Sequence, residues 1–118
     1  MNFDFSTIEA LLQKAHDENL YEKLLSQLQK DFVLANVDVQ ISDTIDSKGL
    51  QSLIREKIYL LILEKFDEYL HLLYIVDIPE SAFKHIRMTD VVEVAEQVTF
   101  LVFKRELEKV FLRKKYTS

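Results

Sequence analysis

The sequence has no cysteine, one glycine and one proline in 118 residues. Without thiols the chain cannot form disulfides, thiolate zinc sites or iron–sulfur clusters, and it has no cysteine nucleophile. A single glycine, Gly49, excludes the glycine-rich loops that hold nucleotide phosphates and the tight turn that presents a catalytic serine. No catalytic motif is recognisable, so we predict a protein that is not an enzyme and uses no cofactor.

Long apolar segments are also missing. The longest fully apolar run, from Ile58 to Leu63, is far shorter than the ~20 residues that span a bilayer. The first residues lack the basic and apolar regions of a secretory signal. We therefore expect a soluble, cytoplasmic protein with no membrane partner.

The net charge is −5, but basic residues gather near the C-terminus. An acidic body argues against a broad nucleic-acid surface, because phosphate binding needs many basic side chains. Cations in the last turns of a helix also complement the helix dipole without any ligand. Our main expectation is therefore that the protein has no nucleic-acid partner. The alternative is an accessory protein that binds nucleic acid through its basic tail. This tail consists of Lys104, Arg105, Lys109, Arg113, Lys114 and Lys115.

Scarce glycine and proline favour helices, because sandwiches and barrels need many turns. The first helical pattern begins at Ser6-Thr7-Ile8-Glu9, which has the form of a capping box. The pattern continues to Phe32 after the polar stretch 16–19, so this part forms two helices or one bent helix. From Leu50 to about Val76 a long pattern runs without glycine or proline, and we expect one central helix there.

Proline and capping residues predict the remaining helices. Pro79 fits the first position of a short helix over 81–86, because the residue before a proline is disfavoured in a helix. Thr89 or Asp90 caps the last helix, which extends into the basic tail. Its many β-branched residues leave a strand over 98–103 as an alternative.

Residues 36–42 change the pattern, since apolar and polar side chains alternate there with the two-residue period of a strand. A single strand leaves its backbone groups unpaired, so it needs a partner, either residues 3–5 or the same segment of a second subunit. The alternative is an extended connector whose apolar side chains pack inward. We predict an all-α fold, a single domain over 1–118 with a small bundle of four to five helices and one short strand or extended segment near 37–41.

Three runs of residues in the C-terminal half carry a resemblance to other proteins. They are Leu72-Leu73-Tyr74-Ile75-Val76-Asp77-Ile78-Pro79-Glu80, Lys104-Arg105-Glu106-Leu107 and Arg113-Lys114-Lys115-Tyr116. These runs resemble the C-terminal half of a group of short bacterial helical proteins with no assigned function. The resemblance implies a bacterial, cytoplasmic helical protein, and it supplies no site residues.

Glu68 and His71 have the Glu-x-x-His spacing that directs a carboxylate and an imidazole toward a metal centre in di-metal helical bundles. The complete site needs a second such pair and two more glutamates, and neither His16 nor His85 provides the repeat. A homodimer would supply the second copy across its axis. We therefore keep Glu68 and His71 as candidate metal ligands, in an alternative function as a metal- or small-molecule-binding bundle. The opposing hypothesis is a surface glutamate beside a partly buried histidine.

The two longest helical patterns are apolar over more than one stripe. Their apolar surface is larger than the core of one small bundle covers. Association of two copies covers such a surface economically. Our leading hypothesis is a non-enzymatic protein that acts through protein–protein association as a homodimer. The alternative is a central helix wholly enclosed by its own chain.

Overall fold

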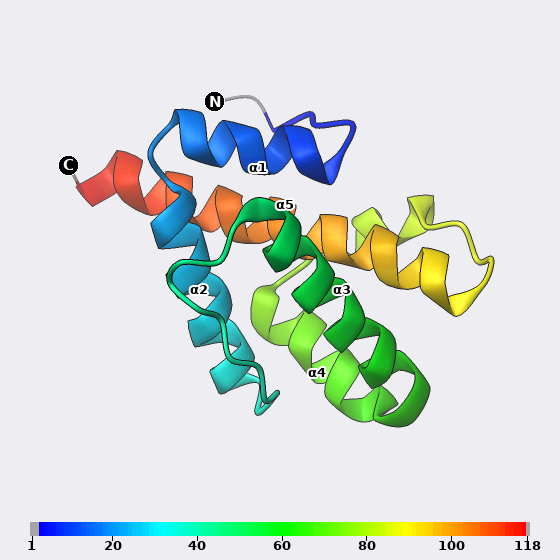
Figure 1. Ribbon diagram of the computed structural model, residues 1–118. Helices are drawn as coiled ribbons and strands as arrows, with labels where there is room; N and C mark the ends of the chain where they lie inside the picture. Colours follow the sequence, from blue (N-terminus) through cyan, green and yellow to red (C-terminus); the bar gives the residue numbers. More distant parts are fainter. Residues whose placement is uncertain (1–2, 118) are drawn as a thin grey trace.

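Five α-helices and one short 3-10 helix form the structure, a computed structural model that describes residues 3–117 (Figure 1). Their bounds are α1 Ile8–Asp17, α2 Tyr21–Leu34, α3 Ser47–Glu64, α4 Phe66–Val76, η1 Glu80–His85 and α5 Val91–Thr117. Residues 3–117 contain no β-strand. The predicted all-α fold is therefore confirmed.

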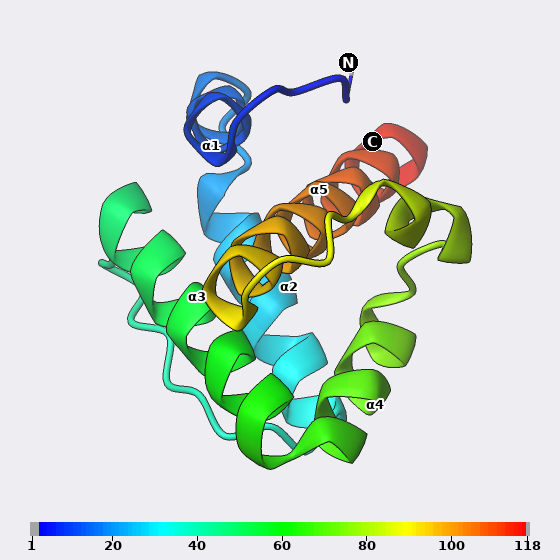
Figure 2. The ribbon, with the colours of Figure 1, turned by 90° about the vertical axis from the view of Figure 1, so that its right-hand side faces the viewer.

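The last helix, α5, is the centre of the fold. It runs across the molecule with α1 on one side and α2, α3 and α4 on the other (Figures 1 and 2). It packs against each of these four helices, so its buried residues cover more than one face. The prediction that residues 50–76 form the central helix is wrong for this reason. The alternative of a strand over 98–103 is wrong too, because these residues lie inside α5.

The expected single helix from Leu50 to Val76 is divided into two at Lys65. This residue has φ −142° and ψ 64°, outside the helical region, and it separates α3 from α4. Neither glycine nor proline marks the position, so the break is a consequence of packing. The turn lets α4 contact α2, α3 and α5 and bury Tyr69, Leu72 and Val76 in the core. A straight helix would carry these side chains away from it.

The first helix starts where the sequence predicts, but with a different cap. Thr7, and not Ser6, is the N-cap, and its Oγ1 accepts a hydrogen bond from the backbone N of Ala10 at 3.0 Å. Asp90 caps α5 in the same manner, because its Oδ1 accepts from the backbone N of Glu93 at 2.8 Å. Both caps satisfy amides that the first turn of a helix leaves unpaired.

Three helices end at a residue in the left-handed conformation. Asn19, Asn36 and Asp77 have φ of 58°, 61° and 69°. In each case the next amide bonds back to an earlier carbonyl, as from Val37 N to Phe32 O at 2.9 Å, which is the Schellman motif. Glycine is the usual residue there, and asparagine and aspartate are the L-residues that tolerate the conformation best. The motif at Asn19 makes α1 and α2 two separate helices. The apolar residues that follow the three positions are all buried: Leu20, Val37 and Ile78.

The segment 37–41 is extended but is not a strand. Val37 and Val39 are buried, as the alternation predicts, so the alternative of a packed connector is the right one. Gln29 of α2 takes the place of a partner strand. Its Nε2 donates to Val39 O at 3.0 Å, and its Oε1 accepts from Ile41 N at 2.9 Å.

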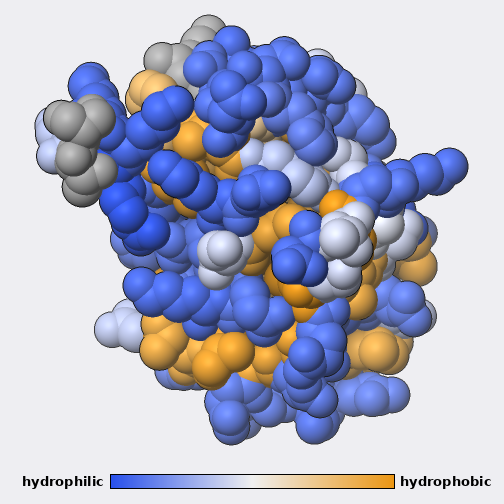
Figure 3. Space-filling view, turned by 60° about the vertical axis from the view of Figure 1, so that its left-hand side comes forward, coloured by the Kyte–Doolittle hydropathy of each residue, from blue (hydrophilic) through white to orange (hydrophobic). Residues whose placement is uncertain are grey.

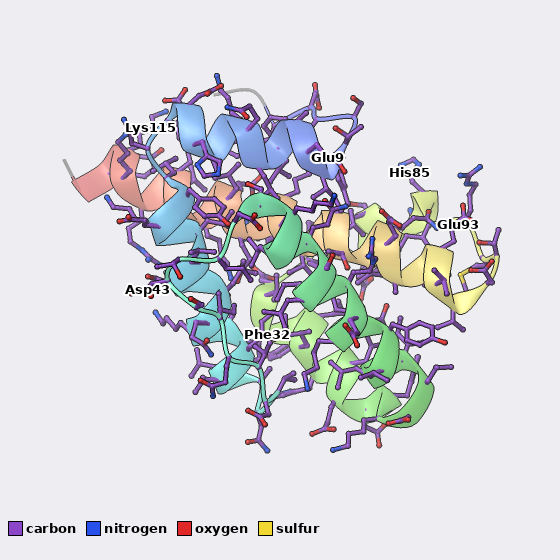
Figure 4. The ribbon with its side chains drawn as sticks, viewed as in Figure 1. Glu9, Phe32, Asp43, His85, Glu93 and Lys115 are labelled. Carbon is purple, nitrogen blue, oxygen red and sulfur yellow. The ribbon has the colours of Figure 1, made fainter. Side chains whose placement is uncertain are left out.

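One hydrophobic core joins the helices. Phe32 points from α2 into the space between the helices and is fully buried (Figure 4). The N-terminal segment packs on α5, where the Phe3 and Phe111 ring centres lie 5.6 Å apart. Residues 3–5 therefore contact α5 and do not pair with 37–41.

Candidate functional site

The outer face of α4 carries a row of exposed apolar side chains. Phe66, Leu70 and Tyr74 lie four residues apart, so they share one face of the helix. They are 53%, 48% and 78% exposed. We call these three residues the α4 stripe. Two further exposed residues, Leu60 and Leu63, extend the apolar surface onto the end of α3.

The stripe exists because α4 is apolar on two faces and the fold covers only one of them. Tyr69, Leu72 and Val76 fill the core, Leu73 and Ile75 are partly buried against it, and the α4 stripe remains outside. Apolar residues also reach the surface elsewhere, for example Val33 and Leu34 at the end of α2. Figure 3 shows one face of the molecule, on which hydrophobic residues lie exposed between hydrophilic ones.

The candidate metal ligands Glu68 and His71 lie on α4 without a third ligand beside them. Oε2 of Glu68 is 3.7 Å from Nζ of Lys65. His71 is exposed and not partly buried, and its ring centre is 6.4 Å from that of Tyr74. Within residues 3–117 no three metal-binding side chains are grouped so as to hold an ion. The metal hypothesis depends on a second copy of the chain and stays a prediction.

A cluster of buried charged side chains lies where α2, α4 and α5 meet. Asp31 of α2 and Glu106 of α5 are both buried. Nζ of Lys109 lies 2.5 Å from Oδ2 of Asp31 and 2.8 Å from Oε1 of Glu106, and it donates to Val76 O at 3.0 Å. Nε2 of Gln27 donates to Asp31 at 3.2 Å. The cluster therefore ties three helices together.

One carboxyl group of this cluster keeps its proton. Burial raises the pKa of Glu106 to about 9, with Asp31 acting in the same direction and Lys109 against it. Burial also acts to raise the pKa of Asp31, but hydrogen bonds with Glu106, Lys109 and Gln27 outweigh burial and hold it below its ordinary value. At neutral pH the cluster thus combines a carboxylate, an ammonium group and a neutral carboxyl. This combination has no net charge, which lowers the free energy of burial.

The two buried carboxyl groups of the cluster, on Asp31 and Glu106, lie outside the linings of the pockets described for residues 3–117. The contacts of Lys109 hold α2, α4 and α5 in register.

The basic tail is largely engaged with the rest of the protein. Arg105 donates to the backbone O and to Oδ2 of Asp77, both at 3.0 Å, and it also pairs with Glu108. Lys109 belongs to the buried cluster. Arg113 donates to Oε1 of Gln27 at 2.8 Å. These contacts fasten α5 to α2 and α4.

Sequence reasoning missed the buried cluster, although one signal for it was present. Glu106 falls at helical spacing among Val102, Phe103 and Val110, which are core residues. A carboxyl group at a core position needs a partner, because an unpaired buried charge is strongly unfavourable. Lys109 is a local partner, three residues further along α5, but local patterns do not identify Asp31, which lies on a helix far away in sequence.

A pocket of about 460 Å³ lies between the N-terminal segment, η1 and α5. Apolar residues such as Ile86 and Phe100 line it together with Glu9 and His85, which Figure 4 labels. Its volume falls within the range of small-molecule sites. It is one place in this fold to test the small-molecule alternative.

Comparison with protein-family models, with curated proteins and with solved structures finds no match to this chain. The resemblance of the C-terminal half to short bacterial helical proteins therefore stays a prediction. No helix in the described part of the chain has the length and apolar character needed to cross a bilayer. Fold and surface together define a small all-α bundle with an exposed apolar stripe.

Proposed function

We propose that this protein acts through protein–protein association and forms a homodimer through the α4 stripe. The observation that carries this proposal is a row of three large exposed apolar side chains on a helix whose other face already lies in the core. Removal of such a surface from water is favourable, and contiguous apolar surface of this kind marks interaction sites.

The spacing of the stripe suits a second copy of the same helix. Phe66 and Tyr74 lie four residues before and four residues after Leu70. When two copies of α4 pack antiparallel about a two-fold axis at Leu70, Phe66 of each copy faces Tyr74 of the other. A two-fold interface requires this kind of self-complementarity. Such aromatic pairs contribute about 0.5–1.5 kcal/mol beyond the area that they bury.

The surface around the stripe supports an interface larger than three side chains. A stable dimer usually buries roughly 800 Å² on each partner. Leu60 and Leu63 near the end of α3 are exposed as well, and the three residues of the stripe are uncharged. The centre of the interface is therefore free of the buried unpaired charge that would oppose association.

The first test is the solution mass of the purified protein by light scattering over a range of concentrations. The proposal expects a mass near twice 14.0 kDa. A protein that remains monomeric at every concentration would contradict the proposal. Metal analysis of the same peak tests the alternative function, because stoichiometric metal would favour a site formed by Glu68 and His71 of two copies.

A substitution at the centre of the stripe tests the interface itself. Leu70→Lys places two like charges at the axis, so we expect a monomer with unchanged helical content. Met88→Lys is the matched control, because Met88 is 85% exposed and lies in the segment before α5, outside the stripe. The control should dimerise as the parent does. Equal masses for the two variants would place the interface elsewhere.

A charge swap tests the antiparallel arrangement. Phe66→Lys and Tyr74→Glu should each weaken the dimer, and the double variant should recover it, because opposite charges then face each other across the axis. Within one chain the two positions are about 12 Å apart along the helix, so the recovery cannot arise inside one copy. A double variant no better than the singles would contradict this arrangement.

A further inference from the structure

Four basic residues from two helices, α2 and α5, surround one pocket. The pocket has a volume of about 290 Å³ and lies between α2 and the last turns of α5. Its lining consists of Lys23, Ser26, Gln27, Lys30, Val110, Arg113 and Lys114. Only part of this set belongs to the basic tail, and the fold supplies the rest from α2.

The two helices place these side chains on facing surfaces. Lys23, Gln27 and Lys30 follow one face of α2, at spacings of four and three residues. Arg113 and Lys114 come from α5, which packs directly against α2. The pocket is therefore a product of the packing between the helices and not of a local charge run.

The wall of the pocket is held in a fixed geometry. Gln27 is buried, its Nε2 donates to Asp31, and its Oε1 accepts from Nη2 of Arg113 at 2.8 Å. These bonds orient the guanidinium group at the pocket. A guanidinium group presents paired donors that match the geometry of a phosphate group.

The charge of this pocket differs from that of other pockets in the described chain. None of its lining residues is acidic. Each of the four other pockets that we describe has at least one carboxylate in its lining. The carboxylates are Glu9 and Glu96 in two of these pockets, Glu56 in the third, and Glu22 and Asp43 in the fourth. Asp31, the carboxylate behind Gln27, is already bound by Lys109. A concentration of positive charge in a protein of net charge −5 indicates an anionic ligand.

We propose that this pocket binds the phosphate or pyrophosphate group of a small molecule. Its volume suits one small ligand, and Ser26 adds a hydroxyl group to the four cations. A nucleic acid is a poorer match, because the lining holds no aromatic side chain on which a base can stack, and binding a strand needs an extended basic surface.

The test is titration of the full protein with inorganic pyrophosphate and with inorganic phosphate, by calorimetry and by thermal shift. Each titration is made at a constant ionic strength set with sodium chloride and is repeated at a higher one. We expect saturable one-site binding that is tighter for pyrophosphate and weakens as salt is raised. The variant Lys30→Gln/Lys114→Gln should bind about tenfold more weakly or worse, because two charge-assisted contacts are lost. Arg113→Lys, which keeps the charge but removes the fork, should bind more weakly than the parent as well.

The control variant is Lys48→Gln/Lys84→Gln, which makes the same change in net charge at exposed lysines of α3 and η1 outside this pocket. It should bind pyrophosphate as the parent does. Equal losses in the two double variants, or no saturable binding by the parent, would overturn the proposal. Binding of a single-stranded oligonucleotide with an affinity that grows with length, without saturable pyrophosphate binding, would overturn it in favour of a nucleic acid.

Discussion

Lys109 on α5 reaches Asp31 on α2, 78 residues earlier in the chain, with 2.5 Å between Nζ and Oδ2. The same ammonium group donates to Val76 O, at the last residue of α4. One side chain therefore connects three helices. The contact is largely shielded from water, so loss of either partner would leave the other charge buried without compensation.

Replacing Lys109 with methionine should destabilise the protein strongly. The carboxylate of Asp31 would remain buried without its cation, and loss of one partner of a buried ion pair usually lowers the free energy of unfolding by about 3–5 kcal/mol. Urea denaturation followed by circular dichroism measures this change. Lys115→Met, at an exposed position near the end of α5, is the control and should change stability little. Similar midpoints for the two variants would show that the buried contact contributes little.

Replacing Glu106 with glutamine should remove a pH dependence of stability. The pKa of Glu106 is about 9 in the folded protein and near 4.5 ordinarily, so between these values the folded chain holds a proton that the unfolded chain has released. Stability therefore falls as pH rises through this window, and glutamine, which does not titrate, abolishes the fall. The variant should match the parent near pH 5 and exceed its unfolding free energy by more than about 1 kcal/mol near pH 8.

The control for this pH effect is Glu64→Gln, since Glu64 is exposed at the end of α3. Its stability should follow the parent across the whole range. If the parent and Glu106→Gln lost stability in parallel as pH rose, the buried carboxyl group would not be protonated in the folded state.

Asn36, the left-handed residue at the end of α2, predicts different effects of glycine and of alanine on stability. Asn36→Gly should leave stability equal or higher, because glycine has no strain at φ 61°. Asn36→Ala should lower stability by about 1 kcal/mol, because a β-carbon is disfavoured in this conformation. Thermal or urea denaturation measures both. Asp38→Ala, in the extended segment that follows, is the control. This interpretation requires that Asp38→Ala lower stability by no more than Asn36→Ala does.

The sequence predicts helices well where local signals act alone. Asp90 and the polar stretch before Leu20 mark helix ends through capping and turn chemistry, and the structure uses both. Local signals fail at Lys65, where the helical pattern continues and the chain turns nevertheless. The turn depends on what α4 gains by contacting three other helices, and that gain is invisible in a window of residues.

The extended segment shows the same limit in another form. The alternation of Val37 and Val39 correctly predicts which side chains face the core. It does not show that the backbone bonds to the side chain of Gln29 in place of a strand. Likewise, the basic tail is visible in the sequence, but Lys23 and Lys30 join Arg113 at one pocket only because α2 packs on α5.

The central position of α5 has a consequence for synthesis of the protein. Helices α1 to α4 leave the ribosome before the one element against which all four of them pack. While residues 91–117 are still inside the exit tunnel, the apolar faces that α5 will cover stay open to water and to other nascent chains. Folding of the bundle is therefore completed only after α5 has been translated and can cover these faces.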